Sequence, residues 1–131
     1  MKLLRVVVDI GHPAHVHFFK NTIWNLEKKG HKVMVVSRDK DVVVELLNAY
    51  GIPHAVLSKV KPGKAHLIEE WFIREYKLLQ VSRKFNPDIL MGILSPTVAQ
   101  VSWILRKKSI FNNGIYFQEA YVFCEVRMCL L

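Results

Sequence analysis

Cysteine and long apolar runs are both scarce in this sequence. The 131-residue chain has two cysteines, Cys124 and Cys129, which form neither a CxxC motif nor a Cys/His pattern of zinc-site spacing. No apolar stretch approaches the roughly 20 residues needed to cross a bilayer, and the N-terminus lacks the small-residue cleavage site of a signal peptide. These absences argue against a disulfide-rich secreted domain and an integral membrane protein, and they predict a cytoplasmic location.

Acidic residues are also few. Eleven Asp and Glu stand against 19 Lys and Arg, which gives a formal net charge of +8 and a pI near 9.7. Such a balance favours anionic partners, namely phosphorylated ligands, nucleic acids or acidic membrane surfaces. The basic residues are spread over expected helix ends and loops without regularly interleaved aromatic residues, so we do not expect nucleic acid to be the partner.

What the sequence does contain is a regular alternation of short apolar runs and amphipathic segments. The β-branched runs predict five buried strands, of which the third and fifth have the weaker patterns. Helical spacing of apolar residues predicts four helices between them. The expected strands are residues 3–10, 32–37, 52–57, 89–94 and 109–111, and the expected helices are 14–29, 40–50, 65–85 and 96–105.

Capping residues and apolar stripes support these helices. Asp39 and Ser95 are expected N-caps, Gly30 and Gly51 are expected to end helices, and Pro87 excludes helix at the residue before it. The residues expected to face the core are Val16, Phe19, Ile23 and Leu26, then Val43, Leu46, Leu47 and Tyr50, and finally Val98, Val101, Ile104 and Leu105.

The alternation predicts the α/β class, with a Rossmann-like parallel sheet flanked by helices. In the usual strand order 3-2-1-4-5, the direction of growth reverses between the first and fourth strands, and a crevice opens beyond their C-terminal ends. Loops 11–15 and 94–96 would line this crevice. Only one glycine, Gly11, follows the first strand, so the GxGxxG dinucleotide fingerprint is absent and no cofactor is expected.

Three histidines, His12, His15 and His17, follow the first expected strand directly. They allow three interpretations: a metal site, a ligand-contacting or acid/base role, or ordinary helix capping and packing. The spacing is not the i, i+4 spacing of helical zinc ligands, and Asp9 is not expected to reach them, so no metal is expected. His12 and His15 are the better catalytic candidates, whereas His17 lies further into the helix, where a structural role is more usual.

The loop after the fourth expected strand supplies two further candidates. Ser95 suits a helix N-cap, and a capping hydroxyl can also contact a ligand. Pro96 suits the first helical position. Gly11 allows a close approach of ligand to backbone, and the amides that follow it favour a phosphate or carboxylate. Gly11, His17, Ser95 and Pro96 are therefore the expected ligand-binding residues.

Aromatic residues recur in the long helix expected at 65–85. Trp71, Phe72 and Tyr76 are expected to pack into the core, and their alternative is an apolar, basic helix face that rests on a membrane or a lipid acceptor. Under this alternative, the helix would make a peripheral contact with a membrane.

Several stretches together resemble one uncharacterised family of archaeal and bacterial proteins. They are VVVDI with GHPAHVHFFKN, EKKGHKVMVVSRDKD, LLNAYGI, FNPDILMG and SP, and the match spans about residues 1–110. The family carries a domain of unknown function and is often described as glycosyltransferase-like. The resemblance implies the N-terminal half of a GT-B architecture, similar to UDP-N-acetylglucosamine 2-epimerases and to the lipid-linked N-acetylglucosaminyltransferase of peptidoglycan synthesis.

The same resemblance implies the function. In such enzymes the N-terminal half holds the acceptor or completes the active site, and the other half binds most of the nucleotide sugar. The chain is therefore expected to be the acceptor-side domain of a sugar-nucleotide enzyme, a glycosyltransferase or an epimerase, inactive alone. A full-length form would bind a nucleotide sugar and an acceptor. The alternatives are a non-enzymatic binding module for a phosphorylated or nucleotide ligand and a histidine-metal hydrolase.

The sequence after the fifth expected strand departs from the family pattern. The family has an acidic Asn-Asp-Thr-Glu-like motif there, but this chain reads FNNGIYFQEA, and Glu119 is not an assured replacement. We therefore expect a Rossmann-like domain over residues 1–110 and an atypical tail over 111–131. The tail either completes an edge of the sheet or results from truncation or an altered reading frame.

Overall fold

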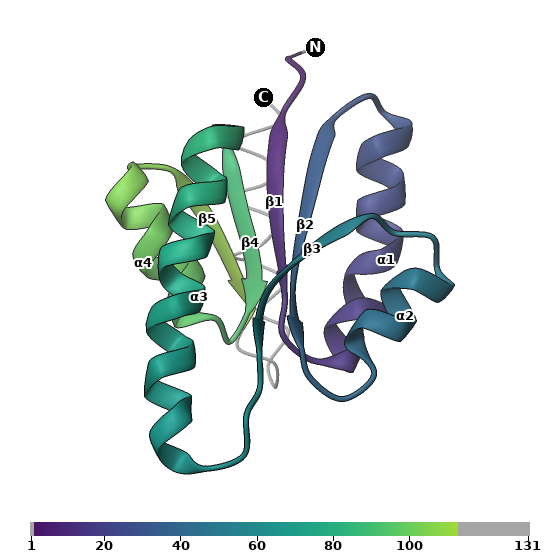
Figure 1. Cartoon of the computed structure of the whole chain (residues 1–131). Coiled ribbons are helices and arrows are strands. Elements are labelled where there is room, and N and C mark those ends of the chain that lie inside the picture. Colours follow the sequence, from purple (N-terminus) through teal and green to yellow (C-terminus); the bar gives the residue numbers. More distant parts are fainter. Residues whose placement is uncertain (1, 113–131) are drawn as a thin grey trace.

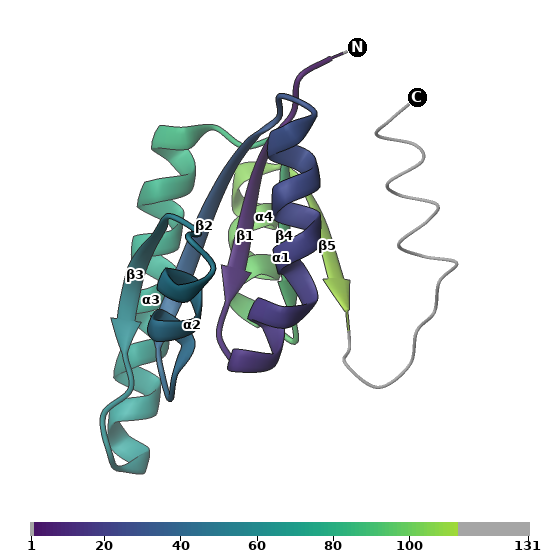
Figure 2. The ribbon, with the colours of Figure 1, turned by 90° about the vertical axis from the view of Figure 1, so that its right-hand side faces the viewer.

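The computed structural model describes residues 2–112, so the expectations for the segment beyond 112 lie outside the described residues. Five strands form one parallel sheet: β1 (Arg5–Ile10), β2 (Lys32–Asp39), β3 (His54–Lys59), β4 (Ile89–Ile93) and β5 (Lys108–Asn112). Their order is β3-β2-β1-β4-β5, and every neighbouring pair is parallel. Figure 2 shows the arrowheads of β1, β3 and β5 pointing the same way. The fold class and strand order predicted from the sequence are confirmed.

Helices cover both faces of the sheet, as Figure 1 shows. Helices α1 (Pro13–Lys28) and α2 (Val43–Ala49) lie on one face, and α3 (Lys64–Phe85) and α4 (Pro96–Leu105) lie on the other. This arrangement follows from right-handed crossovers on either side of β1, where the chain changes direction across the sheet. The switch point lies between β1 and β4.

The side chains of β1 alternate between two separate apolar clusters. Val6, Val8 and Ile10 belong to the cluster under α1 and α2, whereas Val7 belongs to the cluster under α3 and α4. Because successive side chains of a strand point to opposite faces, Asp9 lies on the same face as Val7. Asp9 therefore reaches the sheet edge on the side of α3 and α4, where it is 2% exposed.

Local signals explain where the helices near the switch point begin and end. His12 caps α1 by accepting a hydrogen bond from the Ala14 amide, and Ser95 caps α4 by accepting one from the Val98 amide. Each cap is followed by proline, whose fixed φ suits the first helical position. Gly30 ends α1 with φ of +87°, a conformation that favours glycine. The predicted caps at Ser95 and Gly30 are confirmed.

Two predictions about the helices are wrong. Asp39 does not cap α2, because β2 continues to Asp39 and the N-cap position falls on Val42, which makes no side-chain cap bond. Ile104 is 43% exposed instead of facing the core, because Val98 and Val101 already fill the contact between α4 and the sheet.

The expected core packing of the α3 aromatic residues is also wrong. Trp71, Phe72 and Tyr76 are 38%, 62% and 63% exposed. The N-terminal end of α3 extends beyond the strand ends (Figure 1), and residues 64–69 are all exposed. No sheet lies under this part of the helix, so its apolar side chains stay uncovered by the described residues. None of the described helices is long and apolar enough to cross a membrane.

Candidate functional site

A cleft of about 450 Å³ opens at the C-terminal ends of the strands, between β1 and β4. The loop after β1 contributes Gly11, His12 and His15, and the loop after β4 contributes Leu94, Ser95 and Pro96. The two loops predicted to line the crevice therefore do line it. The volume lies within the range of small-molecule sites, roughly 300–1,000 Å³.

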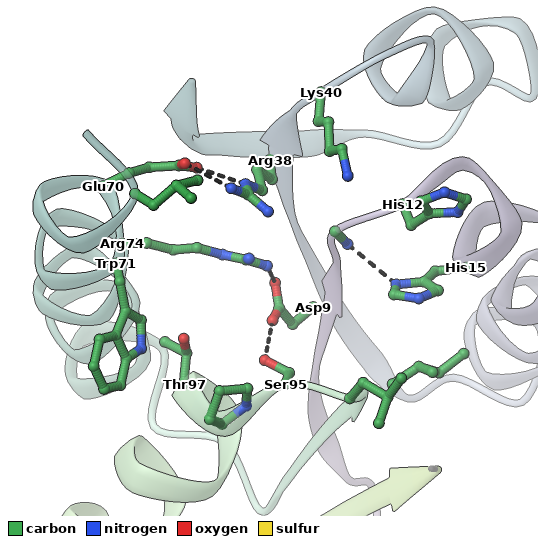
Figure 3. A pocket seen from close by; sticks show the side chains of 15 residues that line it. Asp9, His12, His15, Arg38, Lys40, Glu70, Trp71, Arg74, Ser95 and Thr97 are labelled. Atoms are coloured by element: carbon green, nitrogen blue, oxygen red, sulfur yellow. Dashed lines mark hydrogen bonds and ion pairs between the residues drawn. The ribbon is translucent and has the colours of Figure 1, made fainter. Parts of the chain in front are cut away.

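At the cleft, Asp9 of β1 forms hydrogen bonds with Arg74 of α3 and with Ser95, the N-cap of α4 (Figure 3). Its Oδ2 accepts a 2.6 Å hydrogen bond from the Ser95 hydroxyl, and its Oδ1 accepts a short one from Arg74 Nη2. Ser95 also accepts from the Val98 amide, so the start of α4 is fixed against β1. The hydrogen-bond partners of the Asp9 side chain within residues 2–112 are thus Arg74 and Ser95.

A second ion pair closes the α3 side of the cleft. Glu70 of α3 is 6% exposed and accepts two 2.6 Å hydrogen bonds from Arg38 of β2, one to each carboxylate oxygen. The Ser58 hydroxyl donates a third, at 2.9 Å. Burial by itself raises the pKa of Glu70, but the hydrogen bonds from Arg38 and Ser58 and the charges of Arg38 and Arg74 outweigh it, so the pKa is lowered. Glu70 is therefore a carboxylate at neutral pH.

In both His12 and His15, the ring nitrogen Nδ1 accepts a hydrogen bond from a backbone amide. The Gly11 amide donates to His15 Nδ1 at 3.3 Å, and the Ala14 amide donates to His12 Nδ1 at 3.2 Å. An accepting nitrogen carries no proton, so each neutral ring has its proton on Nε2. His12 and His15 therefore present N–H donors from Nε2, and accepting a proton at Nδ1 would break the backbone hydrogen bond.

The environment of His15 favours this neutral state. Its pKa is lowered, first by burial and then by the nearby charges of His12 and Arg74, whereas Asp9 acts in the opposite direction. The two imidazole centroids lie 5.8 Å apart. His15 is thus a neutral hydrogen-bond donor at pH 7.

Two glycines permit the close packing around Asp9. A Cβ at Gly11 would lie 3.4 Å from Arg74 Nη2, so the guanidinium rests against the backbone there. A Cβ at Gly92, which pairs with Asp9 across β1 and β4, would lie 3.1 Å from the Ser95 Cβ and from Val98 Cγ2. Gly92 therefore lets the start of α4 approach β4 closely enough for Ser95 to reach Asp9.

His17 lies apart from the other predicted site residues. Its Nδ1 is 3.2 Å from the Tyr50 hydroxyl, and it does not line the cleft. Within residues 2–112, no three His, Cys, Asp or Glu side chains are grouped so that they could hold a metal ion.

Sequence reasoning missed the charged residues that come from β2 and α3. Arg38, Lys40, Glu70 and Arg74 all line the cleft. Arg38 and Lys40 lie in the stretch EKKGHKVMVVSRDKD, which did not mark them as site residues, and Glu70 and Arg74 lie in none of the stretches that carry the resemblance. One signal for Asp9 was present: a lone carboxylate at the end of an otherwise apolar buried strand needs a partner. The partner itself was not visible, since Arg74 follows Asp9 by 65 residues.

The sheet order, the helical layers and the cleft at the switch point together define a Rossmann-like α/β domain. The chain belongs to the family described as "protein of unknown function (DUF354)", whose model matches residues 4–120. No curated protein matches the chain.

Solved structures of an epimerase and of glycosyltransferases share this fold. The UDP-GlcNAc 2-epimerase of Neisseria meningitidis, bound to UDP-GlcNAc, superposes with a TM-score of 0.70 at 16% identity over 91% of this chain and 35% of its own. The spinosyn forosaminyltransferase SpnP gives 0.69 at 14% identity over 97% and 36%. The glycosyltransferase SsfS6 of Streptomyces sp. SF2575 gives 0.62 at 18% identity over 82% and 38%. The chain thus spans about a third of the length of these enzymes.

Proposed function

We propose that this chain is the acceptor-side half of a GT-B-like sugar-nucleotide enzyme, a glycosyltransferase, and that it has no turnover alone. A second Rossmann-like half would bind the nucleotide sugar, and this half would bind the acceptor. The fold shared with an epimerase and two glycosyltransferases supports the class of enzyme. The chain covers only about a third of each of them, which supports its role as one half.

The observation that carries the proposal is the cleft at the switch point. Ligands of open α/β sheets bind outside the carboxyl ends of the strands at this point. His12 and His15 stand at its mouth as catalytic residues, and Gly11, Ser95 and Pro96 line it as ligand-contacting residues. His17 is left out of the proposed site because it contacts Tyr50 instead.

Two roles are open to the histidines: a base toward an acceptor hydroxyl, or a donor toward a phosphate. A base needs an unprotonated nitrogen that faces the substrate. In both rings Nδ1 already accepts from a backbone amide, so the available nitrogen is Nε2, which carries the proton. The geometry favours the donor role, in which Nε2–H stabilises negative charge on the substrate or in the transition state.

The test uses a family member that contains both halves. Replacing the histidine at the position of His12 by alanine is expected to lower kcat/KM at least about a hundredfold, as the loss of an oxyanion donor does. His12→Ala also removes the N-cap of α1, which should lower the free energy of unfolding by only about 0.5–2 kcal/mol, so the variant should remain folded in the assay. The matched control is His17→Ala, which should retain turnover because His17 lies outside the cleft. Normal turnover of the His12→Ala variant would refute the proposal.

The exposed face of α3 supports a peripheral membrane contact of the same half. Ile68, Phe72 and Tyr76 recur every four residues along the helix and are 62%, 62% and 63% exposed. Lys64 and Lys77 flank this stripe. An apolar stripe with flanking cations suits the surface of an anionic bilayer. The stripe lies on the helix whose Trp71 lines the cleft, so such a contact would bring the cleft close to the membrane.

A further inference from the structure

The carboxylates among the described residues that line the cleft already pair with arginine side chains of the protein. Asp9 receives Arg74 on one oxygen and Ser95 on the other. Glu70 receives Arg38 on both oxygens. Among the described lining residues these are the only carboxylates, and a guanidinium already compensates the charge of each.

Several donors of the cleft, by contrast, remain unused. Arg38 binds Glu70 through Nε and Nη2, and Arg74 binds Asp9 through Nη2, which leaves Nη1 of each guanidinium without a partner in residues 2–112. Lys40, the residue after β2, has a half-buried side chain whose Nζ has no partner in the same part of the chain. The Nε2–H groups of His12 and His15 add two more donors.

These donors come from two sides of the cleft. Arg38, Lys40 and Arg74 approach from β2 and α3, whereas His12 and His15 approach from the start of α1, as Figure 3 shows. Three full positive charges face two carboxylates, so the cleft keeps a positive excess even with neutral histidines. A ligand that offers only hydroxyl groups would leave this charge uncompensated, whereas an anionic ligand with several acceptor oxygens would pair with donors on both sides.

We infer that the acceptor carries a phosphate monoester, which binds between the cationic side of Arg38, Lys40 and Arg74 and the imidazole side of His12 and His15. The role of this phosphate ester as the acceptor rests on the proposed function, whereas the phosphate-binding site itself does not. A phosphate has three terminal oxygens in a tetrahedral arrangement, so it can accept from both sides at once, which the two coplanar oxygens of a carboxylate do less well. Lys40 is thereby assigned as a binding residue.

The experiment measures binding of glycerol 3-phosphate to the full chain by calorimetry at low ionic strength, with glycerol as the neutral control. Saturable 1:1 binding of glycerol 3-phosphate, and none of glycerol, is the expected result. Lys40→Gln should weaken binding at least about tenfold, since a charge-assisted hydrogen bond is lost. Lys32→Gln is the matched control, because it removes the same charge from an exposed side chain at the opposite end of β2.

Absence of binding, or equal binding of glycerol, would overturn the inference. Equal weakening by Lys40→Gln and Lys32→Gln would also overturn it, because binding would then follow net charge and not this site. A second readout is the ¹⁵N spectrum of the imidazoles: a bound phosphate should raise the pKa of His15, since a nearby anion favours the protonated ring. An unchanged His15 titration at saturating glycerol 3-phosphate would place the ligand elsewhere.

The outcomes also separate this inference from the proposed function. Suppose that glycerol 3-phosphate binds, but the family member that contains both halves retains turnover after His12→Ala. The phosphate site then stands, and the catalytic assignment of His12 fails. If turnover is lost but the chain does not bind glycerol 3-phosphate, the enzyme assignment stands and the acceptor is not a phosphate ester.

Discussion

The buried ion pair between Asp9 and Arg74 should dominate the stability of the cleft, and Asp9→Asn tests this directly. The Asp9 side chain is 1% exposed and that of Arg74 is 13% exposed. The amide keeps the shape of the side chain and can still meet the Ser95 hydroxyl, but it removes the charge that compensates Arg74. Breaking a buried pair by removing one partner typically costs about 3–5 kcal/mol, because the remaining charge stays buried without compensation.

We expect Asp9→Asn to lower the free energy of unfolding by about 3 kcal/mol, measured by urea denaturation at pH 7. A domain of this size has a total of roughly 5–15 kcal/mol, so the loss is a large fraction of it. In the double variant Asp9→Asn/Arg74→Met the uncompensated charge is gone, and the loss should be smaller than in Asp9→Asn alone. The expected coupling energy between the two positions exceeds about 1 kcal/mol.

The matched control is Asp39→Asn. Asp39 pairs with Lys59 at 3.8 Å, but their side chains are 38% and 77% exposed. Solvent screens such pairs, so the control should change the free energy of unfolding by less than about 1 kcal/mol. The reasoning is refuted if Asp9→Asn costs no more than Asp39→Asn, or if the effects of Asp9→Asn and Arg74→Met are additive.

Two further predictions concern pH and the membrane. The pKa of His15 is lower in the folded chain than in the unfolded chain, so the unfolded chain binds a proton at His15 more readily. The contribution of neutral His15 to the free energy of unfolding is therefore complete above the ordinary pKa of 6.5 and is lost as the pH falls through the lower folded value. Between pH 5 and 7, the free energy of unfolding measured with urea should fall less with acidification in His15→Gln than in the parent chain. An identical dependence of this free energy on pH in both chains would contradict the prediction. Co-sedimentation with phosphatidylglycerol vesicles should fall at least about tenfold in Ile68→Ser/Phe72→Ser, since burying each side chain in lipid contributes about 1.5–3 kcal/mol. Trp103→Ser, which alters an 81% exposed residue of α4, should bind like the parent, and equal loss in both variants would exclude the α3 stripe.

Periodicity and capping chemistry were enough to predict the elements and their order. The apolar run before Gly11 is a strand buried on both faces, and Ser95 with Pro96 begins a helix, because these signals act within one or two turns of chain. The failures have a common cause. Asp39 is a good capping residue, but pairing with β3 extends β2 through it. Trp71, Phe72 and Tyr76 are apolar at helical spacing, but α3 turns Glu70, Arg74 and Leu78 toward the sheet, which leaves the aromatic residues exposed.

The sequence by itself determined the two loops of the site, since parallel strands bring their C-terminal ends to one edge wherever the helices pack. It also determined which residue types those loops contribute: histidines at the start of α1 and a serine cap at the start of α4. Only the tertiary structure decided which charges face them. Arg74 meets Asp9 across 65 positions of sequence, and Arg38 meets Glu70 across 32, because packing of α3 against β1 and β2 fixes these pairs and no local pattern encodes them. The chemistry of the histidines has both sources: the backbone amides of their own turn donate to Nδ1, whereas tertiary packing brings the cations of α3 and β2 into the cleft and makes it a place for an anion.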